Sequence, residues 1–400
     1  MTHPNHLTHL LGIQPDRIER PTDIPEVADA VARAAGAGEA VIPWGGGMGQ
    51  DYGYPPRRAD VLLDLSGLDR IVAHEAGDLT ATVQAGVTLR RLQAALGESG
   101  QWLPLDPPQA ERATIGGILA TNAYGPMRVG YGTARDWLIG LTVVDAAGRL
   151  IHGGGKVVKN VTGYDTPKLH IGALGTLGVI VEATFKVAPL PEAAEALLID
   201  LRSADDDAIG GLITALTARR VWPALALLHE AVTGQRYLFL EWRGPREVVA
   251  AEWAAVAALA RDAGTPAPQR LDPSDFQVAE PDDAGATTHL RLTPLPADVW
   301  RTHRAVAAMT LGAASQIRTC PYTGVVDAIC EDPEAAKALL ARDSYADIPA
   351  AVLHAPLSLR RPEDAALWSP LPSSLPMMRA VKEKLDPNGT LNPGRFVGRI

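Results

Sequence analysis

Three glycine-rich segments restrict the fold of this chain more than any other feature. The first, Pro43-Trp-Gly-Gly-Gly-Met-Gly-Gln50, directly follows Ala40–Pro43, a short apolar stretch typical of a buried strand. Successive glycines carry no Cβ, so their backbone N–H groups can converge on one anion and approach it closely. A tight turn is the alternative, although a turn normally needs fewer glycines. The segment matches neither a Walker loop nor the spaced dinucleotide fingerprint.

The second segment is longer. Asp106-Pro-Pro-Gln109 precedes Ala113-Thr-Ile-Gly-Gly-Ile-Leu-Ala-Thr-Asn-Ala-Tyr-Gly125. Thr114 is expected to cap a short helix that Asn122 and Gly125 would end. Two glycines at positions 116 and 117 would let a cofactor lie against bare backbone, and close helix packing is their alternative role.

The third segment, Lys159–Leu169, continues into Gly172-Ala-Leu-Gly-Thr-Leu-Gly-Val-Ile180. Asp165 is expected to cap a helix with Pro167 in its first turn. The last glycines would bring backbone amides beside a flat ring system before a strand over 177–187. Segments of this kind on loops that leave strands are improbable as coincidence, so together they predict a bound cofactor.

The length of 400 residues exceeds what one hydrophobic core usually supports, so we expect two domains. The composition shifts near Val187-Ala-Pro-Leu-Pro191, where prolines end a strand, and we place a boundary there. Before it, irregular mixing of strands and helices argues against a doubly wound sheet. After it, a repeated strand–helix–strand order predicts an antiparallel sheet with helices on one face, ferredoxin-like in style. No short-period internal repeat stands out.

Several single elements follow from local patterns. Pro25–Ala35 predicts a helix, and Thr88 is expected to cap a helix that runs to Leu96 and is ended by Gly97 and Gly100. Trp137–Val144 predicts a strand.

The three segments, in this order and spacing, resemble the flavin domain of the vanillyl-alcohol oxidase and p-cresol methylhydroxylase (PCMH-type) superfamily. The resemblance covers Pro21 to Pro191, and within the superfamily the chain most resembles the FAD-binding E subunits of bacterial glycolate oxidases. It implies an α+β fold: a PCMH-type FAD-binding domain of two α/β subdomains over 1–190, and an antiparallel, ferredoxin-like cap over 191–375. A segment over 376–400 would return to the flavin domain.

By position, the resemblance implies a pyrophosphate loop at Gly45–Gly49 and an adenine or ring-side wall at Gly178 and Ile180. The residues expected to bind FAD are Pro43, Trp44, Gly45, Gly46, Gly47, Met48, Gly49, Gln50, Pro107, Thr114, Ile115, Gly116, Gly117, Thr121, Asn122, Gly125, Arg128, Tyr131, Gly132, Gly175, Gly178, Val179, Ile180 and Asn392. Asn392 belongs to Asp386-Pro-Asn-Gly-Thr-Leu-Asn-Pro-Gly394, which resembles a tail returning to the flavin ring. A proline and glycine turn closing a C-terminal helix is the alternative.

Two departures from the family pattern bear on how the flavin is held. Members with covalently attached flavin commonly have histidine in the first loop, where this chain has Met48, and Trp44 replaces a frequent arginine. We therefore predict non-covalent FAD.

A histidine-rich metal motif, His-x-Gly-Asp-Gly-Asn-x-His, occurs in related 2-hydroxy-acid dehydrogenases but not between Leu190 and Ile400. No metal is expected. The single histidines of the second half are read as packing or surface residues: His229, His289, His303 and His354. The metal-like spacing of His3, His6 and His9 is read as part of a frayed terminus.

The catalytic base stays unassigned. Arg318, Tyr322 and Arg395 are the candidates for holding a substrate carboxylate.

Composition limits the partners. A net charge of −9 argues against nucleic-acid binding, and two cysteines, Cys320 and Cys330, are too few to ligate an iron–sulfur cluster. The N-terminus lacks a signal-peptide pattern, and no apolar run approaches the ~20 residues of a membrane span. We expect a cytoplasmic protein.

The resemblance implies an electron-transferring FAD subunit of a glycolate oxidase. A second FAD-binding subunit would oxidise glycolate to glyoxylate, an iron–sulfur subunit would take the electrons onward, and any peripheral membrane association would come through these partners. The first alternative is a self-sufficient FAD-dependent oxidoreductase acting on another hydroxy acid or alcohol. The second is a structural subunit without cofactor, against which the retained glycines argue.

Overall fold

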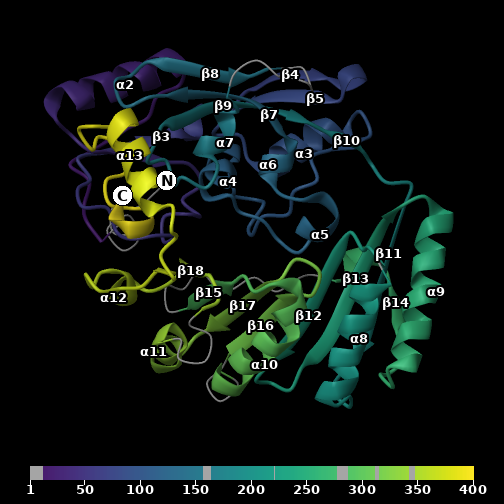
Figure 1. The fold of residues 1–400 in the computed structure, drawn as a ribbon. Helices are drawn as coiled ribbons and strands as arrows, with labels where there is room; N and C mark the ends of the chain where they lie inside the picture. The colour runs from purple at the N-terminus through teal and green to yellow at the C-terminus, as the bar shows by residue number, and fades with distance from the viewer. Residues whose placement is uncertain (1–11, 156–163, 220, 277–286, 311–314, 342–346) are drawn as a thin grey trace.

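The computed structural model describes residues 12–155, 164–219, 221–276, 287–310, 315–341 and 347–400. The predictions for Lys159–Gly163 and for His3, His6 and His9 lie outside these residues. Figure 1 shows an N-terminal part, a cap below it, and a C-terminal segment beside the N-terminal part. Both parts mix helices with antiparallel strands, so the fold is α+β, as expected.

Two main sheets form the N-terminal part. The first is parallel, in the order β1-β3-β2, and the second is antiparallel, in the order β4-β5-β9-β7-β8. Their strands are β1 Arg17–Glu19, β2 Val41–Trp44, β3 Val61–Asp64, β4 Ile71–Glu75, β5 Thr80–Gln84, β7 Leu138–Val144, β8 Leu150–Gly154 and β9 Val179–Lys186. A short pair joins β6 (Gln101–Trp102) to β10 (Ala188–Pro189). The helices of this part are α2 Ile24–Ala37, α3 Leu89–Gly97, α4 Ile115–Thr121, α5 Arg128–Tyr131, α6 Ala134–Trp137 and α7 Pro167–His170.

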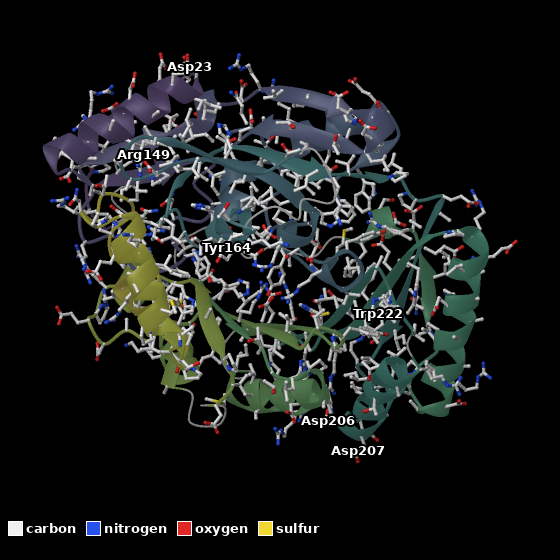
Figure 2. The ribbon with its side chains drawn as sticks, turned by 45° about the horizontal axis from the view of Figure 1, so that its top comes forward. Asp23, Arg149, Tyr164, Asp206, Asp207 and Trp222 are labelled. Carbon is white, nitrogen blue, oxygen red and sulfur yellow. The ribbon has the colours of Figure 1, made fainter. Side chains whose placement is uncertain are left out.

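The first long helix, α2, confirms the helix predicted over Pro25–Ala35. The side chain of Asp23 accepts a hydrogen bond from the backbone N–H of Glu26 and caps the helix, on the outer surface in Figure 2. Its buried face follows helical spacing: Val27, Ala30, Val31 and Ala34. Gly38 ends the helix in the left-handed conformation, with φ of 70°.

Two of the three predicted caps are present. Thr88 accepts a hydrogen bond from Arg91 N, and Thr114 from Gly117 N, both at 3.3 Å. The prediction for Asp165 was wrong, because α7 begins at Pro167 and its capping position is Thr166. The Asp165 carboxylate instead pairs with Lys168 Nζ at 2.6 Å.

The cap is one nine-stranded sheet made of two units with the same element order. Each unit runs strand, helix, strand, strand, helix, strand, and antiparallel pairing of β12 with β16 joins them. The first unit is β11 Ala193–Asp200, α8 Asp206–Ala218, β12 Leu225–Ala231, β13 Arg236–Gly244, α9 Arg246–Asp262 and β14 Gln269–Leu271. The second is β15 Thr288–Leu292, α10 Val299–Thr310, β16 Ser315–Cys320, β17 Val325–Cys330, α11 Pro333–Ala341 and β18 Ala350–His354. The ninth strand, β19 (Trp368–Ser369), pairs with β18 at the edge, so the spatial order is β14-β11-β13-β12-β16-β17-β15-β18-β19.

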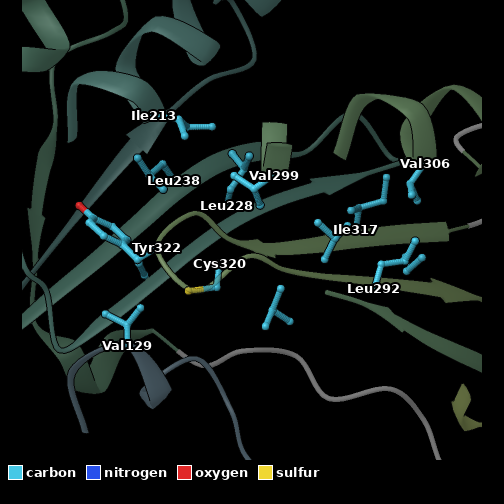
Figure 3. Packing of buried hydrophobic residues seen from close by; sticks show 14 of the residues in the cluster. Val129, Ile213, Leu228, Leu238, Leu292, Val299, Val306, Ile317, Cys320 and Tyr322 are labelled. Carbon is cyan, nitrogen blue, oxygen red and sulfur yellow. The ribbon is translucent and has the colours of Figure 1, made fainter. Parts of the chain in front are cut away.

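Helices cover only one face of the cap sheet, the face directed away from the N-terminal part in Figure 1. In Figure 3, Val299 and Val306 of α10 pack against Leu228, Leu292 and Ile317 of the strands. The first turn of α8 carries exposed acidic side chains at its outer end, including those labelled Asp206 and Asp207 in Figure 2. Because the cap helices lie on one face of the sheet, the opposite face can face the N-terminal part.

The C-terminal segment packs on the N-terminal part. After α12 (Leu357–Arg360) and β19 (Trp368–Ser369), α13 (Leu375–Leu385) leads to a tail beside β2. Val41 N donates to Thr390 O at 2.7 Å, and Asn392 N donates to Val41 O at 3.0 Å. Boundaries at 190 and 375 stay our proposal. Short 3-10 turns complete the described elements at Leu65–Gly67, Ala76–Asp78, Pro273–Asp275, Pro296–Asp298 and Val397–Arg399.

Candidate functional site

A cavity of about 760 Å³ lies between the glycine segments, the C-terminal tail and the helix-free face of the cap. Its volume is in the range of cofactor and small-molecule sites. Most residues expected to bind FAD line it: Pro43, Trp44, Gly45, Gly46, Gly47, Met48, Gly49, Gln50, Pro107, Thr114, Gly116, Gly117, Thr121, Asn122, Gly125, Arg128, Gly175, Gly178, Ile180 and Asn392.

The first glycine segment lies directly on the second. A Cβ at Gly46 would be 2.0 Å from Arg112 O, and one at Gly45 would be 2.3 Å from Thr114 Oγ1. Gly47 has φ of +81°, which L side chains rarely adopt. Side chains at these positions would therefore separate the two segments that form one wall of the cavity.

The two helical glycines of the second segment differ. A Cβ at Gly116 would be 2.9 Å from Ala85 Cβ, so close packing, the alternative considered above, does apply there. A Cβ at Gly117 would meet only Thr114 Oγ1, at 3.2 Å. Both glycines line the cavity. Close helix packing and a bare backbone that faces the cavity therefore occur in the same segment.

Four expected residues do not line the cavity. Ile115 and Val179 are fully buried in separate apolar cores, because neighbouring positions on a helix or strand point in different directions. The Tyr131 ring packs edge-on against Trp102, with centroids 5.1 Å apart. Gly132 has φ of 77°, and a Cβ there would be 2.4 Å from the Asp136 carboxylate, so its glycine serves the local turn.

Asp106, which sequence reasoning did not place in the site, holds the second wall in position. Its carboxylate accepts hydrogen bonds from Gly125 N at 3.1 Å and Met127 N at 2.7 Å. Burial raises the pKa of Asp106 to about 7, although these backbone N–H groups oppose the rise. The only signal in the sequence was its place before Pro107-Pro108 in the second segment.

The cap contributes a row of polar side chains across neighbouring strands. On β15, Leu290 and Leu292 face the core, so His289 and Arg291 face the cavity. Asp327 on β17 lies opposite both Arg291 on β15 and Arg318 on β16. Arg291 donates to both oxygens of Asp327, at 2.7 and 2.8 Å.

Neighbouring charges determine the ionisation state of Asp327 in this row. Burial alone would raise the pKa of Asp327, but the Arg291 guanidinium holds it well below its usual range. The Asp327 carboxylate is therefore ionised beside the Arg291 guanidinium, and with Arg318 on the neighbouring strand this wall has a net positive charge. Arg291 and Arg128 both lie over the Tyr124 ring, 4.3 and 4.4 Å from its centroid.

The reading of the cap histidines as packing or surface residues was wrong for His289 and His354, which line the cavity. Burial lowers the pKa of His289, and its Nε2 lies 3.3 Å from Asp327 Oδ1 without hydrogen-bond geometry. His354 Nδ1 pairs with Asp51. Strand pairing brings together positions that are far apart in the sequence. No local sequence motif predicts this.

The other candidates are placed as follows. The His229 ring stacks on Tyr237, and His303 is buried between Thr319 Oγ1 and Glu230 Oε2 at 2.8 and 2.9 Å. Arg318 and Arg395 line the cavity, whereas Tyr322 packs in the cap core. Among the described residues, no three His, Cys, Asp or Glu side chains gather as a metal site would require.

Comparison with known proteins identifies the glycine-walled part. Residues 15–154 match the FAD binding domain family. The match supports FAD as the cofactor of this protein.

Three curated relatives are similar to the chain. The glycolate oxidase subunit GlcD of Bacillus subtilis is 28% identical over 297 residues, which are 70% of this chain and 63% of the relative. The D-2-hydroxyglutarate dehydrogenase of Xanthomonas citri pv. viticola is 37% identical over 191 residues, 48% of this chain and 40% of the relative. The glycolate oxidase subunit GlcE of Escherichia coli is 41% identical over 136 residues, 34% of this chain and 39% of the relative. The chain thus spans less than two thirds of each.

A solved structure shows the same fold. Alkyldihydroxyacetonephosphate synthase superposes with a TM-score of 0.68 at 19% identity, covering 94% of this chain and 76% of that protein. In the described part of the chain, no helix combines the length and apolarity needed to cross a bilayer.

The cavity fits FAD on its own chemistry. Three buried amide oxygens that line it have no hydrogen-bond partner among the described residues: Gln50 Oε1, Asn122 Oδ1 and Asn392 Oδ1. An unsatisfied buried acceptor costs about 1–3 kcal/mol, so these positions suit a ligand rich in N–H and O–H donors. The flavin ring, ribityl chain and adenine of FAD supply such donors, and the glycine backbone leaves room for its phosphates.

Proposed function

We propose that this protein is an FAD-dependent oxidoreductase that acts in the oxidation of hydroxy acids. The supporting observation is that one cavity has a glycine-rich FAD wall on one side and the Arg291–Asp327–Arg318 row of the cap on the other. Bound FAD supplies the capacity to accept electrons from an alcohol carbon. The relatives include glycolate oxidase subunits and a D-2-hydroxyglutarate dehydrogenase, which supports this substrate class.

The cap residues suit an anionic alcohol. Two guanidiniums against one carboxylate leave this wall positive, which favours a substrate carboxylate. Burial lowers the pKa of His289, which lines the cavity, so its ring is neutral and has one nitrogen able to accept a hydroxyl proton.

More specifically, we propose that the chain is the electron-transferring FAD subunit of a complex that converts glycolate to glyoxylate. Two relatives are named as subunits of glycolate oxidase, which supports an assembly with a second FAD-binding subunit. Cys320 and Cys330 are both buried and too few for a cluster, so an iron–sulfur subunit would carry electrons onward.

Purification of the tagged protein from its native cell, with an absorbance spectrum of each co-purifying component, tests the subunit proposal. A second flavoprotein and an iron–sulfur protein should co-purify, and glycolate should reduce the flavin of this chain only in the complex. Full-rate glycolate oxidation by the isolated chain would contradict the proposal.

The row on the cap also favours a second candidate, a self-sufficient hydroxy-acid oxidoreductase, because it places charged groups where a substrate would face the flavin wall. Anaerobic mixing of the flavin-loaded chain with glycolate and both enantiomers of lactate and 2-hydroxyglutarate separates the two. Rapid bleaching near 450 nm that is lost in His289→Gln supports self-sufficiency. No bleaching by any of these acids supports the subunit.

A further inference from the structure

The C-terminal tail, the first glycine segment and the cap meet around the guanidinium of Arg395. This side chain is only 2% exposed, and it lines the cavity. Its Nη2 donates to the carbonyl oxygens of Gly49 at 3.3 Å and Tyr52 at 3.0 Å. Its Nε and Nη1 have no hydrogen-bond partner in the part of the chain that the structure describes. Nη2 of the guanidinium is thus held by two carbonyl oxygens. Among the described residues, nothing accepts a hydrogen bond from Nε or Nη1.

Arg395 lies near another buried cation. A second buried guanidinium, Arg360, donates to Ala355 O at 2.8 Å and Gly53 O at 3.3 Å. The carboxylate that acts on both is Asp51, which is already paired with His354 Nδ1. Burial, and then Arg360, lowers the pKa of Arg395 to about 9, while Asp51 opposes this. The carboxylate that acts on Arg395 is therefore already committed to His354.

An arrangement of this kind is costly unless something completes it. A buried charge without a partner and buried donors without acceptors both destabilise a fold. A purely structural arginine would use its donors on surrounding carbonyl groups, as Arg395 does with Nη2 alone. The buried His354 Nε2 also has no hydrogen-bond partner among the described residues, which adds a further unused polar atom at the same cavity wall.

We propose that Arg395 binds an anionic oxygen of a molecule in the cavity, a carboxylate or a phosphate, through Nε and Nη1. A planar guanidinium is suited to bidentate contact with either group. The two sources are a phosphate of FAD and the carboxylate of a substrate, and naming them rests on the proposed function. Anion binding itself does not depend on which reaction the flavin performs.

The experiment compares Arg395→Gln and Arg395→Lys with Arg361→Gln, an exposed arginine whose Nη2 donates to Gly12 O. In the first arm, apo-protein is titrated with FAD and flavin fluorescence is followed. In the second, flavin-loaded protein is titrated with oxalate, a dicarboxylate that is not a hydroxy acid, and the flavin spectrum is followed. Loss of a charge-assisted fork should weaken one of these affinities about tenfold or more.

A weaker FAD affinity in Arg395→Gln assigns the phosphate, and a weaker oxalate affinity with unchanged FAD affinity assigns the carboxylate. Arg395→Lys should fall between wild type and Arg395→Gln. Both affinities within twofold of the Arg361→Gln control would overturn the proposal.

A third measurement keeps the proposal testable if Arg395→Gln does not fold. Inorganic phosphate should raise the melting temperature of wild-type apo-protein more than sodium chloride at equal ionic strength, and raise that of Arg395→Lys less. Equal effects in both proteins would overturn the proposal. Because no hydroxy acid is oxidised in any of these assays, failure of the proposed function would be seen separately.

Discussion

Single backbone positions decide whether the FAD wall can form. Gly46 is the most restrictive, since a Cβ there would be 2.0 Å from the backbone oxygen of Arg112, which cannot rotate away. Gly46→Ala should lower FAD affinity at least about tenfold by separating the two glycine segments.

Gly211→Ala is the matched control, because nothing lies within 4 Å of a Cβ on this exposed residue of α8. It should leave FAD affinity unchanged and stabilise the protein by about 0.5–1 kcal/mol. Fluorescence titration with FAD and urea unfolding measure the two effects. Equal FAD affinity in both variants would contradict the steric role of Gly46.

A second residue, Asp106, links the wall to pH. Its pKa is raised to about 7 in the folded state, so the native protein binds this proton more tightly than the unfolded chain. The stability that the protonated carboxyl contributes is present below its usual pKa and is lost as pH rises towards 7. Asp106→Asn should remove this loss, so the free energy of unfolding of wild type should fall relative to the variant between pH 4 and 7. Urea unfolding across that range measures it, and parallel curves would contradict the assignment.

At the scale of elements, a buried ion pair at the end of α13 includes a lysine that also bonds to the N-terminal part. Lys382 Nζ donates to Asp386 Oδ2 at 2.5 Å and to the carbonyl oxygens of Thr176 and Leu391, both at 2.8 Å. Asp386 also accepts from the backbone N–H groups of Thr390 and Leu391, at 2.8 Å each. The pair therefore sets the path of the tail that carries Asn392 to the cavity.

Lys382→Met should destabilise the protein by about 3–5 kcal/mol, because it leaves Asp386 buried without its cation. Adding Asp386→Asn to that variant should recover part of the loss, since the uncompensated charge is then gone. Urea unfolding of the single and double variants measures both. A single variant as stable as wild type, or a double variant less stable than the single, would contradict this account.

Elements were predictable from sequence wherever local chemistry decides them. The helices that follow Thr88 and Thr114 could be predicted because the side-chain oxygen of each threonine accepts a hydrogen bond from a nearby backbone N–H. The prediction that Asp165 caps a helix was wrong because Pro167 fixes the start of the helix and Lys168 attracts the Asp165 carboxylate. The glycine segments were informative for a similar reason, since a missing Cβ is a local property that can be read residue by residue.

The cap row was not predictable in this way. Arg291, Arg318 and Asp327 come from three strands, and only their register places them side by side. Register depends on long-range packing of the sheet, which no local pattern specifies. His289 consequently looked like an isolated residue, although it lies beside this row in the cavity wall.

At the scale of the whole molecule, the cavity walls come from the N-terminal part, the cap and the tail together. FAD should therefore stabilise the complete fold rather than one segment. A ligand that binds only the folded state stabilises it by about 2.7 kcal/mol at a hundredfold excess over its Kd. The melting temperature of the apo-protein should accordingly rise with FAD concentration, and Gly46→Ala should show a smaller rise than Gly211→Ala at the same concentrations.

The same packing should hold the flavin without a covalent bond. Met48 lines the cavity, and its thioether offers no ring nitrogen for a covalent link to the flavin. Acid precipitation destroys the walls, so the yellow colour should move entirely to the supernatant, and FAD should be recovered there intact. Gln50, Asn122 and Asn392 would then account for retention by hydrogen bonding, and replacing any one with an apolar residue should increase the rate of FAD loss on dilution. A yellow pellet after denaturation would contradict this prediction. It would show that a covalent bond, and not the walls of the cavity, holds the flavin.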